Sequence, residues 1–123
     1  MKNLLVLPVF LFSFSTSIFS QGEFTWDQSK KCRVFTSFNI PKGTFTHSGG
    51  VCKDGYLNGK ASVRLFDNNV LWASITGTFE AGYLTGKGEI LWERGDKFSG
   101  DFVKGKRTYG VFTYKSGLIY TGS

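Results

Sequence analysis

The sequence has one histidine, two cysteines, two prolines and one methionine among 123 residues. Because His47 is the only histidine, a four-ligand zinc shell built with Cys32 and Cys52 would need a carboxylate from elsewhere in the chain. No serine, aspartate or cysteine partner stands at a spacing that would suggest a hydrolytic triad with His47. We therefore expect a non-enzymatic protein with no metal, no catalytic residues and no cofactor.

Long apolar runs are missing too, except at the start of the chain. Met1-Lys2-Asn3 precedes an almost wholly apolar segment, residues 4–14, and small polar residues then lead to Ser20. This order is typical of a secretory signal peptide. A membrane anchor is the alternative, but a span needs roughly 20 apolar residues, and this shorter run contains Pro8. We expect residues 1–20 to be removed and the protein to be exported to the periplasm, the cell surface or the medium.

Only two cysteines are present, so only one disulfide is possible within a chain. An exported chain meets an oxidising compartment, where cysteines pair by default. We expect a disulfide between Cys32 and Cys52. Closing a loop of about 20 residues would stabilise the fold by roughly 3 kcal/mol in the chain-entropy model.

Acidic residues are fewer than basic ones, and the formal net charge is +6. The basic residues are scattered, and no basic stripe indicates nucleic acid as a partner. A solvated surface explains this excess of charge. Attraction to anionic lipid or to an envelope glycan is the alternative.

Glycine is abundant, with 16 residues, and its spacing repeats. An eight-residue template with glycine at its third and eighth places occurs at residues 75–82 and again at 98–105. A divergent copy begins near residue 47, and residues 120–122 open a further one. We expect a lead-in with short strands at 21–46, which extends or covers the first repeat, and repeats at about 47–74, 75–97, 98–119 and, in part, 120–123.

The repeated segments alternate with period two and show no helical stripe, so each is predicted to be a β-hairpin in an all-β chain. Alternate residues of a strand share a face, which gives the sheet one aromatic and glycine-rich side and one mostly polar side. Strand glycines such as Gly77 and Gly88 leave room for neighbouring rings. Bend glycines such as Gly82 and Gly105 can take positive φ.

Residues 75–88, with glycine at 77, 82, 86 and 88, closely resemble a unit of the MORN repeat family, and residues 98–105 resemble the front half of one. The divergent Gly50–Leu65 copy, which Cys32 precedes, looks like the variant start found in exported bacterial members. The resemblance implies a single-layer twisted antiparallel sheet of successive β-hairpins, often with a shallow aromatic groove. It also implies a role as a scaffold, a dimerisation surface or a membrane-associated adaptor.

The aromatic face is the candidate binding surface. Its predicted binding residues are Phe79, Trp92, Phe102, Tyr114 and Tyr120. The alternative is that these rings form the packed core of a thin sheet; if some are exposed, they form a patch large enough to bind a partner. Amphipathic rings such as those of Trp92, Tyr114 and Tyr120 suit a partly wet groove.

We expect a protein-binding or scaffolding module. The expected partner is a protein, or a second copy of the chain that pairs with the edge strand near Tyr120. Peripheral association with membrane or envelope lipid and carbohydrate binding through exposed aromatics are the alternatives. A hydrolase that uses paired carboxylates such as Glu89 and Asp101 is the least favoured one. Solvated charges that balance Lys87 and Lys97 explain those carboxylates more simply.

Overall fold

The computed structural model describes residues 22–38, 40 and 42–123. The predicted signal peptide at 1–20 lies outside the described residues. The strands are β1 (Glu23–Trp26), β2 (Arg33–Thr36), β3 (Gly43–Lys53), β4 (Tyr56–Asp67), β5 (Val70–Glu80), β6 (Tyr83–Trp92), β7 (Lys97–Val103), β8 (Lys106–Thr113) and β9 (Ile119–Gly122). Across these residues the structure offers no helix of the length and apolarity that a membrane crossing requires.

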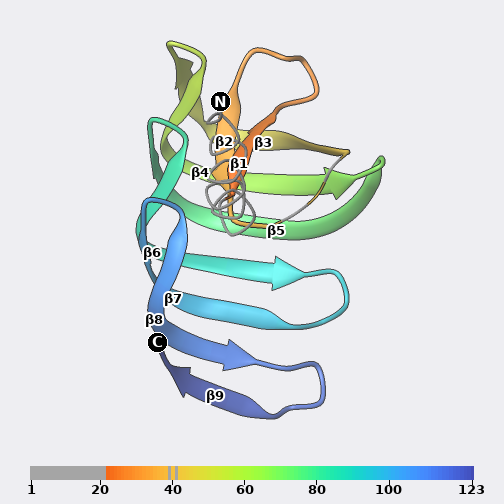
Figure 1. The fold of residues 1–123 in the computed structure, drawn as a ribbon, viewed down its shortest axis with the longest axis vertical. Coiled ribbons are helices and arrows are strands. Elements are labelled where there is room, and N and C mark those ends of the chain that lie inside the picture. Colours follow the sequence, from red (N-terminus) through yellow and green to blue (C-terminus); the bar gives the residue numbers. More distant parts are fainter. Residues whose placement is uncertain (1–21, 39, 41) are drawn as a thin grey trace, which may run out of the picture.

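All nine strands belong to one sheet with the order β1-β2-β4-β5-β6-β7-β8-β9, and β3 also pairs with β4. Every pairing from β3 to β9 is antiparallel and joins strands that follow one another in the chain. Figure 1 shows the result as a curved ladder that descends from β4 to the C-terminal strand β9. The predicted all-β sheet of successive hairpins is therefore confirmed, and its departure from the expected antiparallel order is the parallel pairing of β2 with β4 at Arg33 and Tyr56.

Tight turns with positive φ join the strands. Ala81 and Gly82 join β5 to β6 with φ of 49° and 85°, and Lys104 and Gly105 join β7 to β8 with φ of 48° and 79°. Two successive residues with positive φ are the signature of the turn whose twist matches that of paired strands. The bend glycines thus lie in the conformation that the sequence predicts for them.

A row of glycines crosses the sheet. Gly77 pairs with Gly88, Gly88 with Gly100, and Gly100 with Gly110. Apolar side chains lie directly over this bare backbone: a Cβ at Gly88 would come within 3.1 Å of the Phe102 ring, and one at Gly110 within 2.7 Å of Cζ of Phe98. Strand glycines therefore admit neighbouring side chains, as expected from the sequence.

The two faces of the sheet differ as predicted. We call the face with the buried residues Ile75, Phe79, Ile90 and Phe98 the inner face, and the opposite face the outer face. The largest fully buried side chains all lie on the inner face or on the segment that covers it; they are Phe45, Leu57, Leu65, Val34, Val63 and Cys32. The outer face carries cross-strand ion pairs, with 3.0 Å from Lys87 Nζ to Asp101 and 3.5 Å from Lys97 Nζ to Glu89. These exposed pairs favour the explanation of the carboxylates as solvated, charge-balancing residues.

The N-terminal hairpin β1–β2 runs across the turns of the later hairpins. The N–H of Arg33 donates to the carbonyl of Gly55 over 2.9 Å, and the N–H of Phe35 donates to the carbonyl of Gly82 over 2.8 Å. Val34 is buried, and the Phe38 ring lies 4.9 Å from that of Trp72. The lead-in thus adds strands and also covers the inner face of the first hairpins.

Gly82→Ala should be more destabilising than Gly86→Ala. Both positions have positive φ, at 85° and 76°, so alanine at either should cost about 1–2 kcal/mol. A Cβ at Gly82 would also lie 2.9 Å from the carbonyl oxygen of Arg33, whereas one at Gly86 would meet no atom within 4 Å. We expect an additional loss of about 1–3 kcal/mol for Gly82→Ala. Urea denaturation measures the difference, and equal losses would show that β2 does not dock on this turn.

Candidate functional site

The structure separates the five predicted binding residues into two groups. Phe79, Trp92 and Phe102 are buried, with exposed fractions of 2%, 5% and 3%, whereas Tyr114 and Tyr120 are 41% and 57% exposed. The buried three belong to the core because neighbouring strands and the β2 segment enclose them. Their assignment as ligand-contacting residues is corrected accordingly, and Tyr114 and Tyr120 stay available to a partner.

Exposure rises along one cross-strand row of the inner face. In this row Ile90 pairs with Phe98, Phe98 with Phe112, and Phe112 with Tyr120. Ile90 and Phe98 are buried, Phe112 is partly buried and Tyr120 is exposed. The inner face is therefore buried near β6 and exposed to solvent at β9.

The open end holds a hollow of about 270 Å³, which we call the C-terminal groove. It is lined by Phe98, Arg107, Thr108, Tyr109, Gly110, Phe112, Tyr120, Gly122 and Ser123. The paired glycines Gly110 and Gly122 are among these lining residues. A groove with apolar walls and one cation is typical of a site that binds an amphipathic segment.

Arg107 supplies that cation. Its Cζ atom lies 5.6 Å from the centre of the Phe98 ring, 5.8 Å from that of Trp92 and 6.0 Å from that of Phe38. The residue as a whole remains exposed, but desolvation by its surroundings lowers the pKa of Arg107. Among the residues that the structure describes, no carboxylate lies within ion-pair distance of this guanidinium. The cation is therefore held on aromatic faces without an internal counter-charge.

The place of Arg107 in its hairpin is one that leucine occupies earlier in the chain. Leu57, Leu84 and Arg107 each stand two residues after the glycine of a tight turn, and both leucines are buried. Phe79 pairs with Leu84, and Phe102 pairs with Arg107 in the same manner. A charged side chain thus replaces an apolar one where the inner face becomes open.

Sequence reasoning missed Arg107, although a signal for it was present. The third predicted repeat is one residue short within Lys104–Tyr109. In the structure the bulge opposite Asp101 and Phe102 takes one extra residue in β8, whereas β6 takes two opposite Gly77 and Thr78. The bulge in β8 therefore does not need the glycine that the longer bulge in β6 contains. The missing residue in the third predicted repeat could have drawn attention to Arg107.

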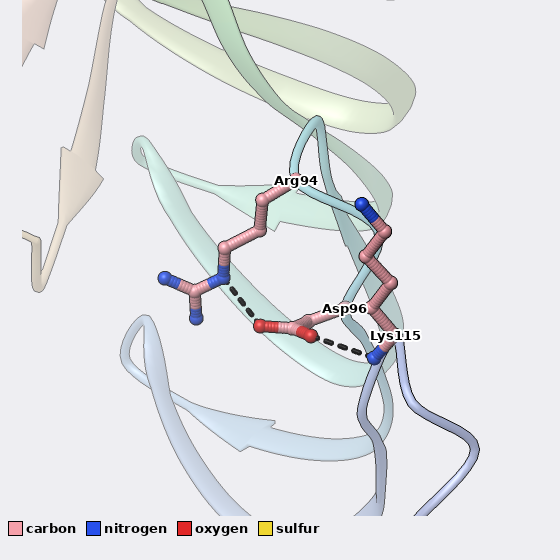
Figure 2. A network of polar contacts seen from close by, with 3 residues as sticks. All are labelled: Arg94, Asp96 and Lys115. Carbon is pink, nitrogen blue, oxygen red and sulfur yellow. Dashed lines mark hydrogen bonds and ion pairs between the residues drawn. The ribbon is translucent and has the colours of Figure 1, made fainter.

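Asp96 links the turn between β6 and β7 to the turn between β8 and β9. Its carboxylate accepts a hydrogen bond of 2.9 Å from the backbone N–H of Lys115 and pairs with Nε of Arg94. Figure 2 shows that Lys115 makes this contact through its main chain while its side chain points away. The bond from Lys115, followed by the bond and charge of Arg94, lowers the pKa of Asp96 despite partial burial. Since Lys115 follows Tyr114, this contact holds the segment that presents Tyr114.

Two other hollows are larger. One, of about 620 Å³, is lined by short polar side chains and lysines, such as Ser62, Thr76 and Lys87, with no ring among its lining residues. The other, of about 510 Å³, lies beside Ile40 and Gly43. It is lined by the rings of Phe24 and Trp26 and by Lys30, together with the carboxylate residues Glu23 and Asp27. The C-terminal groove combines rings and a cation with no Asp or Glu among its lining residues, so it is the candidate site.

No family model matches the chain, and no curated protein matches it either. The MORN resemblance therefore stays a prediction that rests on the glycine and aromatic spacing. The geometry of the site carries the functional argument.

Asp96→Asn should destabilise the protein at neutral pH, with the loss disappearing in acid. A carboxylate whose folded pKa is below its ordinary value of 3.8 contributes stability above that pH, and this contribution is lost as pH falls through the folded pKa. The difference in unfolding free energy between the two proteins should therefore shrink below about pH 4. Urea denaturation at stepped pH measures it. Glu93→Gln, an exposed carboxylate of the same turn, is the matched control, and a pH-independent loss for Asp96→Asn would contradict the assignment.

Proposed function

We propose that this protein is an exported, non-enzymatic binding module of the MORN repeat type. Its C-terminal groove docks a segment of a partner protein that presents a carboxylate next to an apolar side chain. The observation that carries the proposal is Arg107, a cation on aromatic faces with no carboxylate at ion-pair distance among the described residues.

A carboxylate suits Arg107 because a guanidinium offers several N–H donors in a planar fork that matches two carboxylate oxygens. The aromatic surroundings strengthen the pairing, since they desolvate the cation and lower its pKa. A partner's carboxylate would replace the water that now solvates this side chain.

The rings supply the apolar part of the docking surface. Phe112 lines the groove and lies 5.4 Å from Trp92 and 4.6 Å from Tyr114, measured between ring centres, so neighbouring rings support this part of its wall. Tyr120 stands beside Phe112 on the next strand and is exposed. Rings of this kind contribute contact area with little loss of conformational entropy, which favours them in protein interfaces.

Peptides selected from a random phage-displayed library should contain aspartate, glutamate or a free C-terminal carboxylate beside an aliphatic or aromatic residue. Fluorescence anisotropy with the best synthetic peptide gives its affinity. Arg107→Gln should weaken binding about tenfold or more, since hydrogen bonds to charged groups contribute about 1.5–3 kcal/mol. Tyr120→Ala should weaken it as well.

Lys106→Gln is the matched control, because it removes the same charge from the neighbouring, outward-facing position of β8. Equal affinities of the Arg107 and Lys106 variants, or selected peptides without a carboxylate, would contradict the proposal. Vesicles of phosphatidylglycerol distinguish the lipid alternative, for which binding should weaken with salt and be insensitive to Arg107→Gln. A soluble envelope glycan that quenches tryptophan fluorescence would favour the carbohydrate alternative.

The outer side of β9 offers a second route to a protein partner. In the described sheet β9 pairs only with β8, and the exposed apolar residues Leu118 and Ile119 lie at its start. Such a strand presents backbone donors and acceptors that a strand of a second copy can use.

Deletion of residues 119–123 should lower the molar mass in solution if copies associate through β9. Light scattering coupled to size exclusion should show a concentration-dependent mass for the intact chain and a monomer for the truncated one. Leu91→Ser, an exposed apolar residue on another strand, is the control. A monomer before and after truncation would exclude self-association through this edge.

A further inference from the structure

The described part of the chain brings Cys32, His47 and Cys52 together. One donor atom from each residue, the two sulfurs and a ring nitrogen, lies within 4.8 Å of the others. The cysteines are joined as the predicted disulfide, with 5.5 Å between their Cα atoms. The position of His47 beside this pair is not evident from the sequence, because a disulfide alone explains both cysteines.

A bulge in β3 places the histidine there. His47 and Cys52 are five positions apart on one strand, so a regular strand would direct them to opposite faces. The pairing of β3 with β4 shifts register between Gly49 and Val51, and Gly49 and Gly50 have φ of 84° and 67°. Bulges of this kind re-aim side chains and are frequent beside functional sites. The two glycines therefore turn His47 and Cys52 towards each other.

The hydrogen bonds of His47 fix which nitrogen faces the sulfurs. Nδ1 lies 2.8 Å from the carbonyl oxygen of Gly49 and so carries the proton in the neutral ring. Nε2 then has a free lone pair, and it lies 3.8 Å from Sγ of Cys52. A histidine that donates one N–H to a backbone carbonyl and aims its other nitrogen at thiol ligands has the arrangement of a metal-binding histidine.

We propose that reduction of the Cys32–Cys52 disulfide creates a binding site for a thiophilic divalent cation such as Zn²⁺. Its ligands are Sγ of Cys32, Sγ of Cys52 and Nε2 of His47. Cys32 is fully buried, His47 partly buried and Cys52 exposed, so the protein encloses one side of the ion and leaves the other open. Water fills the fourth position of the tetrahedron, as in zinc sites with three protein ligands.

The distances suit this ion after a small adjustment. Tetrahedral zinc has bonds of about 2.3 Å to sulfur and about 2.0 Å to nitrogen, which places its donor atoms about 3.3–3.8 Å apart. The sulfurs must separate from bonding distance, and Cys52 has room to move because it is exposed and lies near the end of β3. His47 already lies at the required separation from Cys52.

The chemistry balances with a dithiol as the reductant. One thiolate of the dithiol attacks Sγ of the exposed Cys52, and Cys32 leaves as a thiolate. The second thiol of the reductant then displaces Cys52 and closes the reductant into a cyclic disulfide. Two electrons pass to the protein, and the two cysteine protons are released to solvent when the cation binds. The oxidised protein has no such site, so metal binding reports the redox state.

This inference is independent of the proposed peptide groove, and cobalt provides its test. The full mature chain is reduced with a phosphine, which removes the need for a competing thiol, and is titrated with Co²⁺ in the absence of oxygen. We expect one Co²⁺ per chain, with thiolate-to-cobalt charge-transfer absorption and the visible bands of a tetrahedral ion. Zn²⁺ should displace the cobalt and abolish both signals.

Variants and the redox state supply the controls. The unreduced protein and the double variant Cys32→Ser with Cys52→Ser should show no charge-transfer band. His47→Ala should retain the thiolate signal but bind Co²⁺ about tenfold or more weakly. Thr46→Ala, the preceding residue on β3, should match the parent. Unchanged affinity in His47→Ala, or no tetrahedral signal from the reduced parent, would overturn the proposal.

Circular dichroism on the same samples covers the case in which reduction unfolds the chain. If the reduced protein loses its strand signal, addition of Zn²⁺ should restore it, because metal binding is then coupled to folding. Failure of Zn²⁺ to restore the fold would count against the site. Restoration in the parent but not in His47→Ala would support it.

Discussion

The close approach of apolar side chains to bare backbone is the constraint on which the rest of this structure depends. Gly77, Gly88, Gly100 and Gly110 stand in register across four strands, and side chains such as Phe98 and Phe102 lie where a Cβ would otherwise be. A thin sheet has no second layer to bury its rings. The glycines let the rings lie down on the sheet itself, and this makes one face both apolar and shallow.

A shallow apolar face needs a cover, and within the part of the chain that the structure describes this cover lies at one end. The β1–β2 hairpin crosses the tight turns and donates backbone hydrogen bonds to Gly55 and Gly82, while Val34 and Phe38 pack over the inner face. At the other end the same row of side chains ends in exposed Tyr120. The change from leucine to Arg107 coincides with the loss of cover, because a cation is tolerated where solvent reaches the face.

Much of this fold could be predicted from the spacing of glycine, since positive φ and close approach both require that residue. The hairpins, the tight turns and the division into an apolar and a polar face follow from it. Three features could not be predicted. Burial of Phe79, Trp92 and Phe102 depends on how β2 folds back, the pairing of Asp96 with the Lys115 backbone joins two separate turns, and the meeting of His47 with Cys52 depends on a local bulge. Each is a long-range or irregular contact that period-two alternation does not encode.

Both proposed sites lie where the ladder departs from regular pairing. The bulge at Gly49–Gly50 turns His47 towards the cysteines, and the one-residue bulge in β8 accompanies the placement of Arg107 over the rings. A regular antiparallel ladder satisfies its own backbone and directs side chains strictly to alternate faces, so it has little freedom to gather unlike groups at one point. A bulge relaxes that alternation over a residue or two without ending the sheet. The regular hairpins therefore provide a rigid scaffold, and the bulges bring together the side chains of the two proposed sites.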